Sequence, residues 1–127
     1  MAKDSKPLFW VGSSKDDLSG FPDEVKYEVG YALRSAQWGE KHSSVKPLKG
    51  FGGAGVLEVV TSFEGNAYRT VYTVKFKKAL YVLHAFEKKS KHGIGTPKEE
   101  IDLVKERLKR AETHYNEWSK ENEKENY

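Results

Sequence analysis

Alternating apolar and polar residues predict three consecutive β-strands in the middle of the chain. The strands span residues 56–63, 67–76 and 79–86, are rich in β-branched and aromatic residues, and are separated by short polar turns. Connections this tight are typical of an antiparallel meander. In the second strand, alternate residues from Tyr68 to Phe76 form a face that we expect in the core. Arg69 and Lys75 project from the opposite face.

Helical periodicity occurs on both sides of this meander. Residues 22–38 begin with a proline and carry apolar residues at three- and four-residue spacing, and Gly39 marks the expected end. Later, Thr96-Pro97-Lys98-Glu99 combines a capping box with proline at the first helical position. An apolar stripe follows, formed by Ile101, Val104, Leu108, Ala111 and Tyr115.

The remaining segments give the element order β-α-α-β-β-β-α. Residues 6–11 predict a short strand, a short helix follows Ser13 or Ser14, and residues 40–55 read as a glycine-rich loop. This order predicts an α+β fold with a small antiparallel sheet, helices packed on one side and the other face partly open. We expect one domain over residues 1–118 and a charged, disordered tail over residues 119–127.

Composition narrows the class of protein. The chain has 127 residues and no cysteine, which excludes disulfides and thiolate metal sites and fits a reducing compartment. No apolar run is long enough to cross a bilayer, and the first residues lack the apolar region of a signal peptide, so we expect a cytoplasmic protein without a membrane partner. Its four histidines show no HExxH-like spacing, so no metal or other cofactor is expected.

Charge is unevenly distributed along the chain. Six lysines and one acid lie between residues 75 and 92, whereas residues 16–28 carry five acids and one lysine. A local basic cluster attracts phosphate groups, and the stretch FEKKSKHG at 86–93 follows directly after a predicted buried strand. Two interpretations stay open at this point. The lysines either make a strand end soluble or form the end of a site for an anionic substrate.

Arg69 and this basic stretch together have the chemistry for cleaving RNA. The reaction needs a base for the 2′-hydroxyl, cations for the pentavalent phosphate, and an acid for the leaving oxygen. An arginine can donate two parallel hydrogen bonds to the phosphate, and histidine can transfer protons near neutral pH. Structural roles are the alternatives: Arg69 pairing with Glu58 of the neighbouring strand, His84 as a buried core histidine, and His92 as a solvated turn residue.

Three segments carry a resemblance to a known family: YRTVYTVKF at 68–76, LYVLHAFEKKSKHG at 80–93 and TPKEEIDLVKERL at 96–108. With VKPLKGFGGAGVLEVV and FPDEVKYEVGYALRSAQWGE upstream, they resemble the phage-derived branch of the RelE/HigB toxin superfamily. The resemblance implies a microbial-ribonuclease-like α+β fold and the toxin of a type II toxin–antitoxin pair that cleaves mRNA on the ribosome. It implies as partners mRNA, the ribosome and a helix-turn-helix antitoxin, with operator DNA bound only through the antitoxin complex.

The same resemblance assigns roles to individual residues. It implies that Arg69 and Lys89 stabilise the transition state and that His92 transfers a proton. The residues that would hold RNA are Lys49, Lys75, Lys88 and Lys91. Glu58 departs from the lysines that RelE carries in this strand, and it would orient Arg69 or act as a base. Two alternatives stay open: a gyrase inhibitor of the ParE type on the same fold, and an inactive remnant that binds only its antitoxin.

Overall fold

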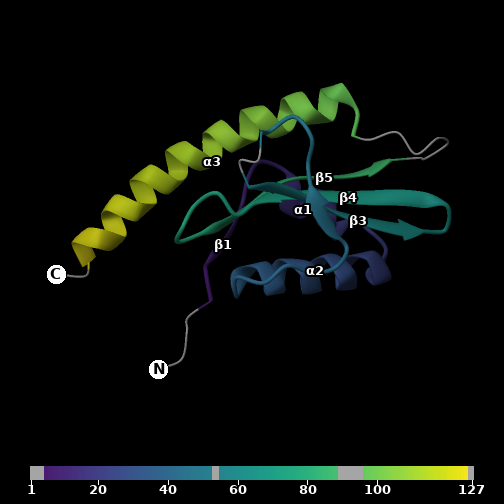
Figure 1. Cartoon of the computed structure of the whole chain (residues 1–127), viewed down its shortest axis with the longest axis horizontal. Helices are drawn as coiled ribbons and strands as arrows, with labels where there is room; N and C mark the ends of the chain where they lie inside the picture. The colour runs from purple at the N-terminus through teal and green to yellow at the C-terminus, as the bar shows by residue number, and fades with distance from the viewer. Residues whose placement is uncertain (1–4, 53–54, 89–95, 126–127) are drawn as a thin grey trace.

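The computed structural model describes residues 5–52, 55–88 and 96–125. In chain order its elements are β1 (Leu8–Trp10), α1 (Ser14–Ser19), α2 (Asp23–Gln37), β2 (Val45–Pro47), β3 (Val56–Phe63), β4 (Asn66–Thr73), β5 (Leu80–Lys88) and α3 (Lys98–Glu125). They form one five-stranded sheet in the order β1-β5-β4-β3-β2. The β3–β4–β5 meander is antiparallel as predicted, and β1 joins its edge parallel to β5 (Figure 1).

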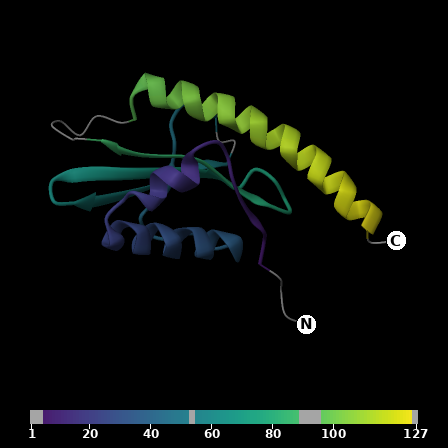
Figure 2. The same ribbon diagram turned by 180° about the vertical axis from the view of Figure 1, so that it is seen from behind.

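Apolar side chains divide into two cores, one on each side of the sheet. α2 lies along one face and buries the predicted stripe of Val25, Val29, Leu33 and Ala36 together with Leu18 of α1. α3 crosses the opposite face, where its buried Val104 and Ala111 belong to the second core (Figures 1 and 2). The mixed α+β class is confirmed, and α1 and α2 share one side of the sheet. The opposite face, which we expected to be partly open, is covered by α3.

Leu83 marks an irregularity in β5 that directs two consecutive side chains toward α3. Val71 pairs with His84 but Tyr72 pairs with Val82, so Leu83 is an extra residue in β5. Leu83 packs in the second core, and the next residue, His84, also reaches α3. Without this bulge, consecutive side chains of the strand would point to opposite faces, and either Leu83 or His84 would point toward α2.

Three differences from the sequence-based expectations are larger than a shift of two residues at the end of an element. Residues 45–47, expected in a loop, form β2 by pairing antiparallel with β3. The middle strand ends at Thr73, so Phe76 packs in the second core and not on the face of Tyr68. α3 continues to Glu125, so the expectation of a disordered tail is wrong for residues 119–125. Across the described ranges, no helix is both long and apolar enough to span a membrane.

Candidate functional site

Glu58 and Arg69 form a buried ion pair on the α3 side of the sheet. Arg69 Nη1 donates to Glu58 Oε1 across 3.0 Å, and both side chains are more than nine-tenths buried. The strand register explains the contact. Glu58 of β3 lies opposite Val71 of β4, and Arg69 is two residues away on the same face, so the two residues are diagonal neighbours. The pairing weighed from the sequence is therefore present in the structure.

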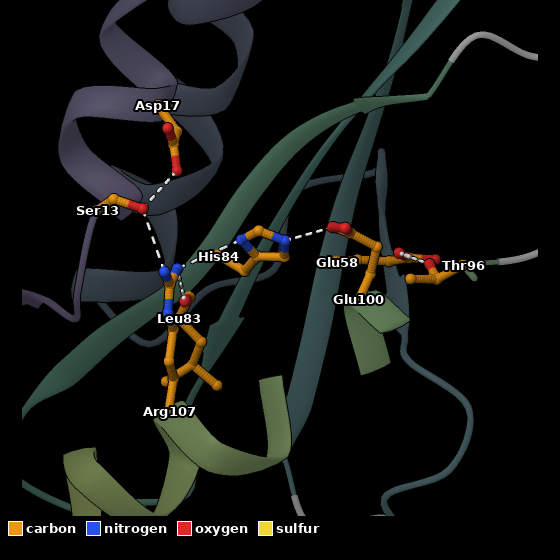
Figure 3. A network of polar contacts seen from close by, with 8 residues as sticks. All are labelled: Ser13, Asp17, Glu58, Leu83, His84, Thr96, Glu100 and Arg107. Carbon is orange, nitrogen blue, oxygen red and sulfur yellow. Dashed lines mark hydrogen bonds and ion pairs between the residues drawn. The ribbon is translucent and has the colours of Figure 1, made fainter. Parts of the chain in front are cut away.

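Glu58 also receives groups from two other parts of the chain. Thr96, just before α3, donates its hydroxyl to Glu58 Oε2 across 3.0 Å (Figure 3). Lys46 of β2 lies directly opposite Glu58 in the register, and its ammonium is 3.8 Å from Oε1. The carboxylate is thus held by β2, β4 and the entry to α3. This arrangement fixes the position of Arg69.

A pocket of about 580 Å³ opens above this pair. Its cationic lining residues are Lys46, Lys49, Arg69, Lys98 and Lys105, and its acidic ones are Glu58 and Asp102. Pro47, Leu48 and Ile101 supply apolar wall. An excess of positive charge in a concave site concentrates anions there. The pocket is therefore suited to a phosphate ester that also carries an apolar or planar group.

Arg69 has a buried nitrogen whose hydrogen-bonding capacity is unused in the described part of the chain. Within the described residues, its buried Nε has no hydrogen-bond partner. A buried donor without a partner carries a desolvation cost of about 1–3 kcal/mol. Arg69 also lines the pocket, so its guanidinium is positioned to contact an anion bound there.

The structure places the predicted site residues in different locations. Lys49 lines the pocket with Arg69 and Glu58. Lys75 does not line it: its ammonium pairs with Glu112 of α3 across 3.0 Å and lies 5.8 Å from the Phe76 ring centroid. Lys88 is the last residue of β5, opposite Ala67 and on the sheet face that carries Arg69. The predicted residues Lys89, Lys91 and His92 lie outside the described residues.

Sequence reasoning missed three lysines of this pocket. Lys98 and Lys105 are seven residues apart in α3, which puts them on one side of the helix two turns apart. That spacing was available in the sequence. Lys46 was not recognisable in the same way, because its position depends on β2, which has only three residues and pairs with β3.

A second polar cluster anchors α3 to the sheet beside the pocket. The buried guanidinium of Arg107 donates to the Leu83 carbonyl across 3.0 Å and to the Ser13 hydroxyl across 3.1 Å (Figure 3). Arg107 Nη1 also lies 3.3 Å from His84 Nδ1, and His84 Nε2 contacts the Glu100 carboxylate. Since a guanidinium only donates, Nδ1 accepts and Nε2 carries the proton toward Glu100. The prediction that His84 is a partnered core histidine is confirmed.

This anchor determines where the pocket lysines of α3 lie. Glu100 and Arg107 are held by β5 and by the β1–α1 connection, and they flank Ile101 and Lys105 of the pocket wall along the same helix. The polar cluster and the pocket are connected by α3, which contributes residues to both. Rotating or sliding α3 would displace both.

Comparison with known proteins places the chain in a family. No curated protein matches it. A solved structure with a similar chain is the crystal structure of the toxin–antitoxin complex RelBE2 from Mycobacterium tuberculosis, with 17% identity, a TM-score of 0.45, and coverage of 70% of this chain and 98% of that chain. The family model described as phage-derived protein Gp49-like (DUF891) matches residues 16–109. Because that match spans well over half of the sequence, the chain belongs to the phage-derived Gp49-like family.

Proposed function

We propose that this protein is the toxin of a type II toxin–antitoxin pair and that it cleaves mRNA without a metal ion, during translation. The observation that carries the proposal is the position of Arg69, which lies buried in a pocket lined by four lysines. Membership of the Gp49-like family and the sequence resemblance to RelE/HigB toxins point to the same function. An mRNA target implies that the protein acts in the cytoplasm.

Arg69 has the chemistry to bind the scissile phosphate. In the proposed reaction the 2′-hydroxyl attacks the adjacent phosphorus, the 5′-oxygen leaves, and a cyclic phosphate remains. Negative charge grows on the non-bridging oxygens, and fixed cationic donors stabilise that charge most when they are already in position. Glu58 keeps the guanidinium in position through its 3.0 Å contact, which is the orienting role expected of it. Lys46, Lys49, Lys98 and Lys105 would contact the neighbouring phosphates.

The remaining catalytic assignments follow the resemblance. We assign proton transfer to His92, transition-state stabilisation to Lys89, and contacts with RNA backbone to Lys88 and Lys91. In the sequence, Lys89, Lys91 and His92 lie between Lys88, the last residue of β5, and Thr96, which donates a hydrogen bond to Glu58. The proposed partners are mRNA, the ribosome and a helix-turn-helix antitoxin, through which alone the protein would reach operator DNA.

The decisive test is primer extension on a reporter mRNA in a bacterial translation extract. Wild-type protein should cut within codons, and Arg69→Ala should cut about 10²–10³ times more slowly, the scale for losing one preorganised donor. Arg34→Ala is the matched control, because Arg34 is an exposed arginine of α2. Circular dichroism spectra would establish that each variant is folded.

Each outcome decides between the functions considered. Cuts that need both translation and Arg69 support the proposal, whereas Arg69→Ala cutting at the wild-type rate contradicts the role of Arg69. Cuts that persist with translation blocked indicate a nuclease for free RNA. Growth arrest without any RNA cuts indicates a gyrase inhibitor, and no arrest indicates an inactive remnant.

A further inference from the structure

The outer face of α2 exposes large aromatic side chains. Tyr27 is 83% exposed, Tyr31 63% and Trp38, the residue that caps the helix, 44%. Among the described residues the only other large hydrophobic side chain with comparable exposure is Val74. Exposed aromatics gathered on one helix face are typical of a protein interface, because aromatic side chains are enriched there and scarce elsewhere on the surface.

Gly30 is exposed midway along α2, one turn after Tyr27 and next to Tyr31 at the edge of the aromatic face. A Cβ added there would meet no atom within 4 Å in the described part of the chain. Glycine in a helix interior costs about 1 kcal/mol relative to alanine. Packing within the molecule gives no reason for that cost. A glycine between exposed tyrosines leaves a notch through which another helix can approach closely.

We propose that α2 pairs antiparallel with α2 of a second copy, around a twofold axis between residues 30 and 31. Such an axis puts the ring of Tyr31 over the partner subunit's Gly30, and by symmetry the partner subunit's Tyr31 over Gly30. It puts Tyr27 opposite the partner subunit's Arg34, where the cation can lie against the ring. Each chain thus contributes one protruding side chain, Tyr31, and one recess, at Gly30, at the same height along the helix axis. A self-complementary interface requires such a match.

A surface hollow near the C-terminal end of α2 can receive a side chain of the second copy. Its volume is about 220 Å³, and its lining residues are Tyr31, Arg34, Ser35, Trp38 and Glu40. In the antiparallel pair, the partner subunit's Tyr27 faces this hollow. Tyr27 is the most exposed of the large hydrophobic side chains described, so its burial would remove the most apolar surface from water.

Charge along α2 favours the antiparallel orientation. Asp23 and Glu24 lie in the first turn, and Arg34 lies in the last turn. Antiparallel pairing brings the acidic end of one helix toward the basic end of the other, whereas parallel pairing would bring like charges together. The acidic end also disfavours RNA as the ligand of this face.

The proposed dimer would leave the Arg69 pocket open. α2 covers one face of the sheet and α3 covers the other (Figure 1). The pocket is lined by residues of the sheet and of α3, so it lies on the face away from α2. The inference therefore does not depend on the proposed nuclease function. Because one helix face forms a small interface, we expect association that depends on concentration and not a permanent dimer.

Sedimentation equilibrium from low micromolar to near-millimolar concentration tests this inference. Wild type should shift from monomer to dimer, and Gly30→Leu and Tyr31→Ala should each raise the dissociation constant by about tenfold or more. Leucine fills the notch but keeps the helix, since it is a good helix former. Val74→Ala is the control, because it removes exposed apolar surface elsewhere and should not change the constant.

A crosslinking experiment gives an independent result, because the chain has no cysteine. Gly30→Cys lies beside the proposed axis and should form a disulfide-linked dimer under mild oxidation, whereas Val74→Cys should form far less. Wild type that remains monomeric at every concentration, or a dimer unaffected by both Gly30→Leu and Tyr31→Ala, overturns the inference. In the first case the aromatic face is left for a different protein.

Discussion

Glu58 and Arg69 lie diagonally across β3 and β4 with Oε1 and Nη1 3.0 Å apart, and both are buried beside an open pocket. For a buried ion pair of this kind, replacing one residue and replacing both have very different effects on the free energy of unfolding. Removing one partner leaves an uncompensated buried charge, whereas replacing both by apolar residues is often nearly neutral.

The first prediction follows from this difference. Arg69→Met should lower the free energy of unfolding by about 3 kcal/mol, because Glu58 stays buried and loses its guanidinium partner, while Lys46 and Thr96 remain as its partners among the described residues. The double variant Glu58→Leu/Arg69→Met should recover most of that loss. Urea unfolding of the two variants and of wild type measures the difference. Equal stability of the single and double variants would contradict the prediction.

The pocket lysines and Lys75 should differ in their contribution to RNA binding. Lys105→Ala removes a pocket cation and should weaken binding and reduce the salt dependence by about one phosphate contact. Lys75→Ala removes a surface pair with Glu112 and a contact with the Phe76 ring, both outside the pocket, and should leave RNA affinity unchanged. Fluorescence anisotropy with an oligonucleotide that lacks the scissile 2′-hydroxyl, over a salt series, measures both. A larger loss for Lys75→Ala would place the RNA path along the far part of α3.

Arg107 should be a main anchor of α3. Arg107→Met removes the bonds to Leu83 and Ser13, and we expect a loss of about 2–3 kcal/mol in unfolding free energy. Arg110→Met is the matched control, because Arg110 is an exposed arginine of the same helix. Urea unfolding followed by circular dichroism should show the loss only for Arg107. Equal losses would indicate a general effect of charge on α3.

Gly12 provides a second test of the same anchor. It has a φ of +58°, and a Cβ there would lie 2.9 Å from Arg107 Cζ. Gly12→Ala should therefore destabilise the protein through both backbone strain and displacement of the guanidinium. Gly52→Ala has a comparable φ of +56°, and no atom of the described residues lies within 4 Å of a Cβ added there, so it isolates the backbone effect. Gly12→Ala should be the more destabilising of the two in thermal unfolding.

Two buried tyrosines should make stability fall at alkaline pH. Burial raises the pKa of Tyr72 and of Tyr81 from 10.0 to about 12 in each case. Because the pKa is higher in the folded state, the unfolded chain releases the tyrosine protons first as the pH rises. The free energy of unfolding is therefore unaffected by these groups below pH 10 and falls progressively between about pH 10 and pH 12. Tyr72→Phe should reduce this loss. Urea unfolding at a series of pH values measures it, and an unchanged alkaline slope in Tyr72→Phe would assign the effect elsewhere.

Local sequence patterns predicted most of the secondary structure. The apolar period of α2 and the three strands of the meander depend on residues close together in the chain, and all are present. Pro22 is the N-cap of α2 and not its first helical residue, and Gly39 lies just beyond the C-cap Trp38. β2 was not predicted, because three residues have no periodicity of their own and become a strand only by pairing with β3. The helical tail was misjudged because residues 119–125 lack an apolar stripe, yet they continue a helix whose earlier turns are packed on the sheet.

The sequence by itself determined the class of fold and the family, because these depend on residue type and order along the chain, and it singled out Arg69 as a candidate site residue. Only the tertiary structure decided what surrounds Arg69. Strand register brought Glu58 to it, β2 brought Lys46, and the packing of α3 brought Lys98 and Lys105. The same packing drew Lys75 away to Glu112. Contacts between residues far apart in sequence arise from register and from helix placement, and neither is written in a local pattern.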